Sequence, residues 1–499
     1  MCTVRASEGA GIAEIAADCL AGRVAVEAVL ESHVVRHQAT HAALNALVQP
    51  RHAAAFEEAE AVTAAIAAGA PPKPLAGVAV SVKECFPVRG LITTLGIASR
   101  RHAVDTIDAS IVTRLRAAGA VIVGKANVPQ AMFLHETDNP VWGRTCHPTH
   151  PDRNPGGSSG GDAALVAAGV VPLAVGTDLA GSIRQPAHAC GIAGIVPRTA
   201  TLGDGGSLNT MPHLRLVRPR AGLLAARVAD LRTGLAALNA APAHAITDIR
   251  RLRIGWFDDC GPLESAPAIR RGVREAVAAV TAAGATVTQI QGSLWEEAAW
   301  LQLSLLSADG GSDVRGLYRG SRPMPSVARL LRLAGLSRWI RPAVAAIAQA
   351  SGREIEAQAV RVTGWRSAAS MQELEQACAE LRRELFSLAA SCDAIICPVS
   401  AVPAMRHGTA GRLVVAASPC LAANLFDLPA GAVPVTTVRA DEETGRPPAR
   451  DPVARLAAET DRESRGLPVG VQVIGLVSEP LAGEQFVLDV MDCIEAATA

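Results

Sequence analysis

The spacing of hydrophobic and polar residues divides the first two fifths of the chain into helical and strand-like stretches. Residues 10–70 carry Ala, Val and Leu at helical intervals, and the prolines of AGAPPKP, from Ala68, end that region. Short apolar runs follow: LAGVAVSVKE from Leu75, AAGAVIVGKANVP from Ala117, and VVPLAVGTD before residue 179. Each run is typical of a buried strand, and helical stretches separate them. This alternation predicts an α/β fold built on a mostly parallel sheet with crossover helices.

The second half of the chain has a different pattern. Residues 220–385 are rich in helical spacing and poor in glycine punctuation, whereas strand-like runs return at DAIICPVS, LPAGAVPVTTV and GLPVGVQVIG, from Asp393, Leu428 and Gly466. Strands on both sides of a helical stretch indicate that the two ends of the chain complete one sheet. Residues 440–466 are polar and predict an exposed loop with some helix.

Composition narrows the classes of partner and compartment. Lys plus Arg and Asp plus Glu both number 47 in 499 residues, which disfavours nucleic acid and acidic membranes as partners and favours a small neutral or apolar molecule. The 11 cysteines contain no C-x-x-C pair and predict free thiols in a reducing compartment. Neither a signal peptide nor a spanning apolar segment is evident, so we expect a cytoplasmic protein.

Residues 153–169, RNPGGSSGGDAALVAAG, place glycines and two serines before a helical stretch. A phosphate cradle would suit a helix N-terminus, but the G-K-[ST] and G-x-G-x-x-G patterns are missing. A nucleophile elbow needs a strand just before the serine, and the preceding CHPTHPDRNP has three prolines instead. A His-dependent triad would have to draw on His188, His213, His244 or His407. A purely structural glycine turn is the third interpretation.

Two further segments change this balance: Lys83 in VSVKECF and Ser182 in GTDLAGSIRQPA, with Ser182 lying 24 residues after Ser158. Together with NVPQAMF, NPGGSSGGDAAL, NLFDLPAGAVPVTTV and GLPVGVQVIG, they resemble the amidase signature family, with motifs closest to the fatty acid amide hydrolase branch without an N-terminal membrane helix. The resemblance implies the amidase signature fold: a large, mostly parallel mixed β-sheet covered by helices on both faces. It also implies a single domain over 1–499, with N-terminal helices (1–70), a catalytic core (75–205), a helical substrate-pocket insert (210–390) and C-terminal strands that complete the sheet (391–499).

The resemblance assigns catalytic roles to three residues: Ser182 as nucleophile, Ser158 as bridging serine and Lys83 as base. A serine hydroxyl needs a neighbour that accepts its proton, and a lysine can do so when burial lowers its pKa enough to leave it neutral. A cis peptide between Gly157 and Ser158 is also implied. The backbone amides of Leu179, Ala180, Gly181 and Ser182 would form the oxyanion hole. Gly157, Ser159, Asp178 and Arg184 would support the two loops.

Two positions depart from the family pattern. Ala180 replaces a glycine and is tolerated only where its φ angle is negative. In GIVPRTA, Val196 takes the place of the usual basic residue, and Arg198 follows two positions later. This second departure affects substrate-side contacts rather than the chemistry.

These features predict a serine amidase that cleaves a carboxylic amide, with a hydrophobic acyl group, to acid and amine without cofactor or metal. Two alternatives remain: an acyl transferase or amide synthase that uses the same acyl-enzyme, and the transamidase component of a tRNA-dependent amidotransferase. The segment from Met324 to Ser351 alternates apolar residues with arginines. It suits a membrane surface, which we do not favour, an ordinary packed helix, or a homodimer contact.

Overall fold

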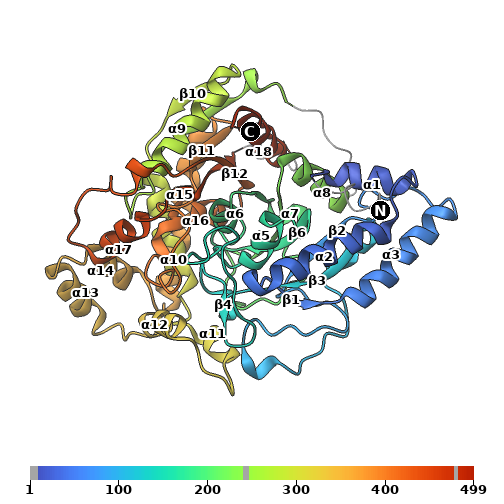
Figure 1. The fold of residues 1–499 in the computed structure, drawn as a ribbon. Helices are drawn as coiled ribbons and strands as arrows, with labels where there is room; N and C mark the ends of the chain where they lie inside the picture. Colours follow the sequence, from blue (N-terminus) through green and yellow to red (C-terminus); the bar gives the residue numbers. More distant parts are fainter. Residues whose placement is uncertain (1–8, 240–246, 477–481, 499) are drawn as a thin grey trace.

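The computed structural model describes residues 9–239, 247–476 and 482–498, and its centre is an 11-stranded sheet (Figure 1). The strand order is β1-β3-β2-β6-β8-β7-β12-β13-β11-β9-β10. These strands are β1 (Leu47–Pro50), β2 (Ala79–Lys83), β3 (Val121–Ala126), β6 (Leu173–Asp178), β7 (Ala193–Val196), β8 (Arg220–Ala225), β9 (Arg253–Trp256), β10 (Thr286–Gln289), β11 (Ala394–Pro398), β12 (Ala430–Thr437) and β13 (Pro468–Gly475). A separate small pair consists of β4 (Asp138–Asn139) and β5 (Gly143–Arg144).

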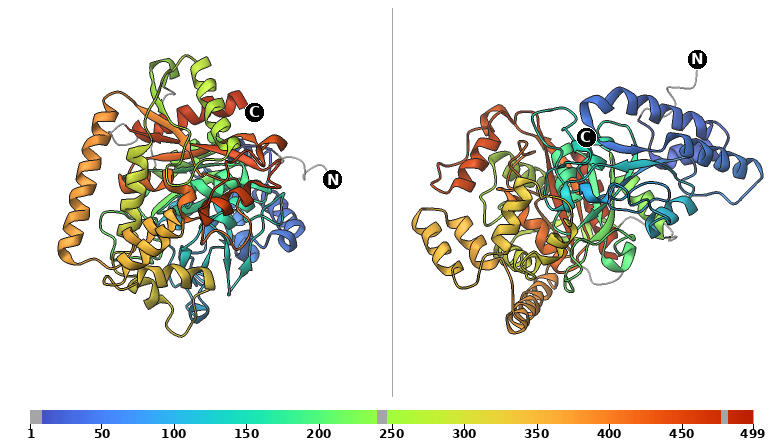
Figure 2. Two further views of the ribbon diagram at one scale, coloured as in Figure 1. Left: turned by 90° about the vertical axis from the view of Figure 1, so that its left-hand side faces the viewer. Right: turned by 90° about the horizontal axis from the view of Figure 1, so that it is seen from below.

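The described helices surround this sheet. They are α1 (Ile12–Leu20), α2 (Val26–Leu44), α3 (His52–Ala67), α4 (Ser110–Ala117), α5 (Gly160–Ala167), α6 (Arg184–Cys190), α7 (Thr199–Leu202), α8 (Val228–Asn239), α9 (Pro267–Ala282), α10 (Ser293–Leu306), α11 (Ser312–Leu317), α12 (Pro325–Ala334), α13 (Arg341–Ala350), α14 (Glu354–Val362), α15 (Ala368–Ala389), α16 (Ser418–Leu425), α17 (Pro452–Asp461) and α18 (Ala482–Thr498). The N-terminal helices lie at one end of the molecule and α12 to α14 at the other, while α15 runs along the margin (Figure 2).

Helices cover both faces of the sheet, as predicted. Gly222 and Leu223 are successive residues of β8, so they face opposite sides. A side chain at Gly222 would touch Ile183 in the turn before α6, whereas the side chain of Leu223 lies close to Gly234 of α8. The α/β class and the large mixed sheet are therefore confirmed.

The balance of strand directions differs from the mostly parallel arrangement that we expected. Among the described strands of the sheet, four neighbouring pairs are parallel and six are antiparallel. The crossovers themselves are present: β6 and β7 point the same way, as do β11 and β12. However, β8 lies antiparallel between the first two, and β13 lies antiparallel between the other two. Alternation along the sequence identifies a crossover, but it does not show that a later strand enters between its two strands.

The stretch 210–390 contains more sheet than the helical insert that we expected. It contributes β8, β9 and β10 to the main sheet. The β9 and β10 sequences, RIGW and TVTQ, span only four residues each and include polar side chains, so they lack the long apolar run of a central strand. The short β1 strand was missed for the same reason.

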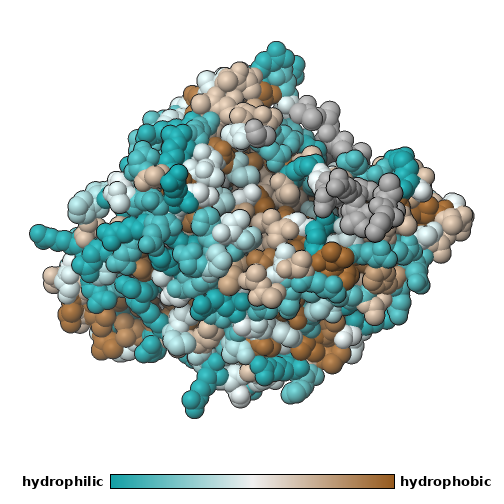
Figure 3. All heavy atoms as spheres, in the orientation of Figure 1, coloured by the Kyte–Doolittle hydropathy of each residue, from teal (hydrophilic) through white to brown (hydrophobic). Residues whose placement is uncertain are grey.

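No helix in the described ranges is long and apolar enough to span a membrane. The segment before α13, and α13 itself, nevertheless expose large apolar side chains: Trp339 is 78% exposed, Ile340 52%, and Ile347 on α13 67%. Figure 3 shows hydrophobic atoms gathered over this part of the surface. Buried Val327, Leu331 and Ala334 suit the packed-helix interpretation for α12, but the exposed residues from Trp339 onward do not.

Candidate active site

The three predicted catalytic residues come from the ends of two neighbouring strands and one glycine-rich loop. Lys83 is the last residue of β2, and Ser182 lies in the turn between β6 and α6. Strands β2 and β6 are parallel neighbours, so their carboxyl ends meet at one edge of the sheet. Ser158 lies in the loop that leads into α5. The topology therefore brings the three segments together.

Lys83 is completely buried and directly contacts the glycine-rich loop. Its Nζ lies 2.7 Å from Ser158 Oγ, 2.8 Å from Thr177 Oγ1 and 3.2 Å from the Thr177 carbonyl oxygen. Burial lowers the pKa of Lys83, and the nearby Cys85, Asp162 and Asp178 partly oppose that shift. Thr177 thus fixes the amine from one side while Ser158 meets it from another.

The three serines differ in how much of each residue is exposed. Ser159 is fully buried, whereas Ser158 is 3% and Ser182 8% exposed, and Ser182 lines a cavity. The Ser159 amide donates to the Ser182 carbonyl at 3.1 Å, which ties the two loops together. The peptide between Gly157 and Ser158 is cis, as the resemblance implied. No hydrogen bond between the Ser158 and Ser182 hydroxyls is present among the described residues.

Close packing explains why glycines flank the serines. A side chain at Gly157 would come within 2.5 Å of the Leu134 carbonyl oxygen. One at Gly160 would come within 2.2 Å of Thr137 Oγ1. The loop therefore lies against its neighbours so tightly that neither position has room for a Cβ atom.

Asp178 and Arg184 form a fully buried ion pair beneath the Ser182 turn. Arg184 donates to both carboxylate oxygens of Asp178, at 2.9 and 3.1 Å, and also to Gln472 and Asn424. Burial alone raises the pKa of Asp178, but the Arg184 guanidinium and the bound backbone amides hold it below its usual range. Arg184 is not the surface charge that an isolated arginine would predict.

The backbone amides of the predicted oxyanion loop, residues 179–182, are not equivalent, although we expected all four to serve as donors to the substrate. The Gly181 amide donates to Asp178 Oδ1 at 2.7 Å, so this amide already has an acceptor. The amides of Leu179, Ala180 and Ser182 have no acceptor among the described residues. Gly181 has a φ of +98°, which favours glycine, whereas Ala180 is not among the residues with positive φ. The departure at Ala180 is therefore accommodated without backbone strain.

A cavity of about 170 Å³ opens beside Ser182. Its walls come from α10, α12 and α14, from the segment at 132–135, and from residues 414 and 415. The lining side chains are mainly aliphatic or thioether groups with one aromatic ring, Phe133, and the polar members are His135, Ser182, Ser307 and Thr363. Val196 and Arg198 are not part of its described lining. The cavity suits a hydrophobic group placed next to the Ser182 hydroxyl.

The structure adds four residues that sequence reasoning missed. Thr177 holds Lys83, and Asp162 accepts from Ser81 Oγ at 3.0 Å, with burial raising its pKa to about 7. His135 and Gln302 contact the carbonyl groups of Ala180 and Leu179 at 3.0 and 2.7 Å. Asp162 and Thr177 stand inside the sequence motifs described above. For Gln302 the only signal is one amide within an otherwise largely apolar buried face of α10.

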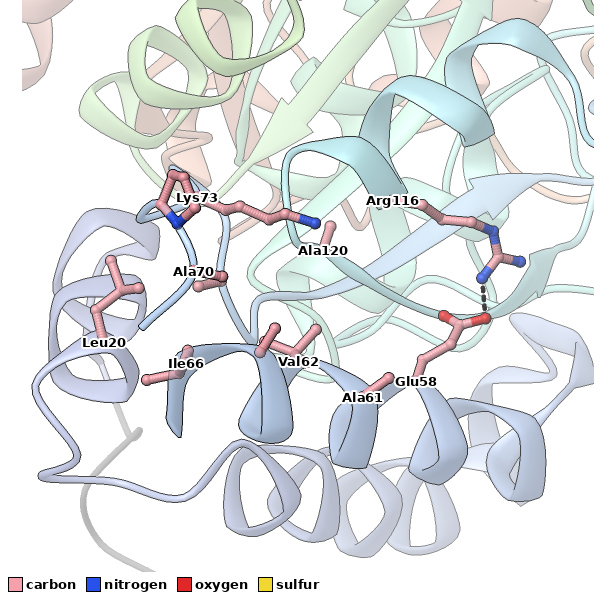
Figure 4. A pocket seen from close by; sticks show the side chains of 12 residues that line it. Leu20, Glu58, Ala61, Val62, Ile66, Ala70, Lys73, Arg116 and Ala120 are labelled. Atoms are coloured by element: carbon pink, nitrogen blue, oxygen red, sulfur yellow. Dashed lines mark hydrogen bonds and ion pairs between the residues drawn. The ribbon is translucent and has the colours of Figure 1, made fainter. Parts of the chain in front are cut away.

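Two other features lie outside this site. A hollow of about 210 Å³ between α3 and residues 70–76 is lined mainly by small aliphatic side chains, with the Glu58 and Arg116 ion pair at one end and Lys73 beside it (Figure 4). It contains none of the predicted site residues. His213, Asp309 and Asp313 also cluster, but their contacts include bonds from the amides of Gly311 and Asp313 to Asp309, so intrachain hydrogen bonds hold the group.

Comparisons with known proteins identify the family of this chain. The amidase family model matches residues 28–479. Fatty-acid amide hydrolase 1 of Sus scrofa is 30% identical over 429 residues, which cover 81% of this chain and 73% of that protein. A glutamyl-tRNA(Gln) amidotransferase component from Acidothermus cellulolyticus is 35% identical over 289 residues, covering 56% of this chain and 57% of that protein.

A solved fatty acid amide hydrolase superposes with a TM-score of 0.85 at 21% identity, over 100% of this chain and 87% of that one. At that identity the superposition supports the fold alone, while the family model covers most of the sequence. The expected resemblance is thus confirmed, and the chain belongs to the amidase family and is an amidase.

Proposed function

We propose that this amidase hydrolyses a carboxylic amide with a hydrophobic acyl group through an acyl-enzyme on Ser182, with Ser158 and Lys83 as a proton relay. The observation that carries the proposal is the contact of 2.7 Å between fully buried Lys83 Nζ and Ser158 Oγ, beside a Ser182 that opens onto an apolar cavity. Without a neutral amine in that position, neither serine would have a base.

The contacts of Lys83 fit a neutral amine. Such a group has two N–H donors and one lone pair. The Thr177 carbonyl oxygen can only accept, and Thr177 Oγ1 is placed to accept a second bond. The lone pair is then left for the Ser158 hydroxyl, which donates to Lys83. Burial, which lowers the lysine pKa, favours this protonation state.

The reaction then proceeds in two halves. Ser182 Oγ attacks the amide carbon while its proton passes to Ser158 Oγ and the Ser158 proton passes to Lys83 Nζ. The negative charge forms on the carbonyl oxygen. As the C–N bond breaks, the leaving nitrogen takes a proton from Ser158, which Lys83 replenishes, because an amine anion is too basic to leave. Water then attacks the acyl ester by the same relay and releases the acid.

The relay requires a hydrogen bond between the two serine hydroxyls. Catalytic hydrogen bonds are often long or misaligned without substrate and tighten in the Michaelis complex. The proposal therefore places this contact in the substrate-bound state. The bond from the Ser159 amide to the Ser182 carbonyl keeps the two loops close enough for it to form.

The acyl group is assigned from the cavity beside Ser182. Aliphatic walls from α10, α12 and α14 offer no charged partner, so an alkyl chain suits them better than a charged acyl group. The exposed apolar residues from Trp339 to Ile347 provide a contact surface, which would serve a homodimer or a membrane. The cysteines of the described residues are free thiols, in keeping with the cytoplasmic location that we propose.

The decisive experiment compares four proteins: wild type, Ser182→Ala, Ser158→Ala and Ser159→Ala. Acid and amine release would be measured on primary amides, anilides and N-acyl amines of graded acyl length. We expect hydrolysis by wild type and by Ser159→Ala, and near-complete loss in the other two. Within the described ranges, the Ser159 hydroxyl forms a hydrogen bond only to the Thr177 carbonyl. Equal activity of Ser182→Ala and wild type would refute the proposal.

Two other outcomes would reassign the function. Turnover that requires an added amine or alcohol would identify an acyl transferase or amide synthase. Activity only with an added partner protein together with aminoacyl-tRNA would identify a transamidase, the kind of protein that the relative from Acidothermus cellulolyticus is.

A further inference from the structure

Every carbonyl group of the loop from Asp178 to Gly181 is held by a hydrogen bond. The Asp178 carbonyl accepts from Asn424 Nδ2 at 3.3 Å, and the Gly181 carbonyl accepts from the Gln185 amide at 2.8 Å. Between them, the Leu179 carbonyl accepts from Gln302 Nε2 at 2.7 Å, and the Ala180 carbonyl contacts His135 Nε2 at 3.0 Å.

These bonds fix the direction of the amides as well as of the carbonyls. A trans peptide unit is planar, so its N–H points opposite to its C=O. The peptide unit that carries the Leu179 carbonyl also carries the Ala180 amide. Because Gln302 holds the carbonyl, the Ala180 N–H faces away from Gln302. This amide has no acceptor among the described residues, and Ala180 lines the cavity beside Ser182.

The next peptide unit is held from both sides. His135 contacts its carbonyl, and Asp178 Oδ1 accepts from its amide, which belongs to Gly181. That amide is therefore committed to the loop rather than to a substrate. The Ser182 amide, opposite the held Gly181 carbonyl, again has no acceptor within the described ranges. Together with Leu179, Ala180 and Ser182 thus have the amides that the loop leaves free beside the cavity.

We infer that Gln302 of the helix α10 is a positioning residue that turns the Ala180 amide toward the developing oxyanion, an inference that rests on the proposed function. Gln302 is fully buried, and its Oε1 has no hydrogen-bond partner in the described part of the chain. A buried acceptor without a partner lowers the free energy of unfolding, so stability of the fold does not explain a glutamine at this position. Its amide nitrogen accounts for its presence because that nitrogen holds the Leu179 carbonyl.

Helix α10 would then contribute to catalysis as well as to the wall of the pocket. Helix α10 also supplies Leu303 and Leu306 to the cavity wall. A single helix therefore shapes the acyl site and orients a donor for the reaction. A change in α10 would alter bond formation even where no atom of α10 touches the reacting carbonyl.

The test follows Ser182 reactivity directly, so it does not depend on knowing the natural amide. An alkyl fluorophosphonate is the probe: Ser182 Oγ bonds to phosphorus, fluoride leaves, and the serine proton passes to the relay. Mass spectrometry of the intact protein gives the maximal rate of labelling (kinact) and the half-saturating concentration (KI). Gln302→Met removes the donor while keeping the length of the side chain. Ser304→Ala is the matched control, because its buried hydroxyl donates only within α10, to Trp300.

Removing an oxyanion donor outright costs ~100- to 1000-fold, and a donor that remains but is less well aimed should cost about tenfold. We therefore expect Gln302→Met to lower kinact about tenfold with KI within about twofold of wild type, and Ser304→Ala to change neither. Gln302→Asn, one methylene too short to reach Leu179, should reproduce the fall in kinact if the methionine variant does not fold.

A variant with weaker binding but unchanged kinact would overturn the inference and leave Gln302 a residue of the pocket wall. Unchanged kinact and KI would also overturn it. Wild-type protein that is not labelled at Ser182 would refute the proposed nucleophile itself, and the inference with it. The two failures are therefore distinguishable.

Discussion

His33 offers a quantitative test of how burial controls charge in this structure. The side chain lies on α2, is 1% exposed, and its Nδ1 lies 2.9 Å from the Val170 carbonyl oxygen. Because a carbonyl oxygen only accepts, Nδ1 carries the hydrogen, and Nε2 has no hydrogen-bond partner among the described residues. Burial lowers the pKa of His33 to about 4, the bond to Val170 opposes the shift, and charge on His52, His37 and Arg36 adds to it.

The size and sign of the effect follow from linkage. The folded-state pKa lies below the unfolded value of 6.5, so the unfolded chain binds more protons between these values. Stability is fully present above about pH 6.5 and falls as the pH drops through that window. At ~1.4 kcal/mol per pKa unit, the full loss from His33 is about 3 kcal/mol, of which about 2 kcal/mol is reached at pH 5.

The variant His33→Asn removes the titration while its side-chain amide can still donate to Val170. Urea unfolding near pH 8 and near pH 5 should show a loss for wild type that is larger, by about 2 kcal/mol, than the loss for the variant. His102→Asn, at an exposed position outside the histidine cluster of α2 and α3, serves as the control. The reasoning fails if His33→Asn loses as much stability between the two pH values as wild type does.

Three further predictions concern the active site. Lys83→Met should lower kcat at least ~100-fold because it removes the proposed base. The thermal unfolding temperature should not fall, since burying the amine of Lys83 already costs solvation free energy. A variant that is stable and fully active would contradict the relay. Arg184→Met should lower the free energy of unfolding by about 3–5 kcal/mol, because it leaves Asp178 charged and buried, and Arg184→Lys should recover part of the loss in urea titrations. In wild type, kcat/KM should rise about fourfold for each methylene added to the acyl chain, because each buried methylene contributes ~0.8 kcal/mol, until the cavity is filled. Leu331→Trp should end that rise at a shorter chain. A variant with the same length profile as wild type would place the acyl group elsewhere.

The parts of the fold and site that the sequence predicted are those with local signals. VSVKECF places Lys83 at the end of an apolar run, and the structure ends β2 at that residue. Likewise, the serine loop precedes a helix and the GTDLAGSIR segment follows a strand, as glycine punctuation and apolar periodicity indicated. Family resemblance supplied the roles of the residues, which their spacing alone would have left open.

The parts that the sequence did not predict depend on long-range contacts. Strand β8 enters between β6 and β7, and its residues give no sign of that position. Gln302 reaches Leu179 across 123 residues of sequence. The Gly181 amide donates to Asp178, and nothing in GTDLAGSIR shows that the Asp178 side chain turns back toward that amide. Side-chain contacts of this kind are set by packing, which periodicity does not describe.

The bond from Arg184 to Gln472 has a consequence for synthesis of the chain. Gln472 lies on β13, 288 residues after the arginine that fixes the Ser182 turn. At ~5–20 residues per second, a ribosome needs roughly 15 to 60 s to add the intervening residues. A nascent chain therefore carries Lys83 and both serines well before it can complete their support. If Ser182 is the nucleophile that we propose, it becomes competent only near the end of translation, when almost the whole protein is available to enclose it.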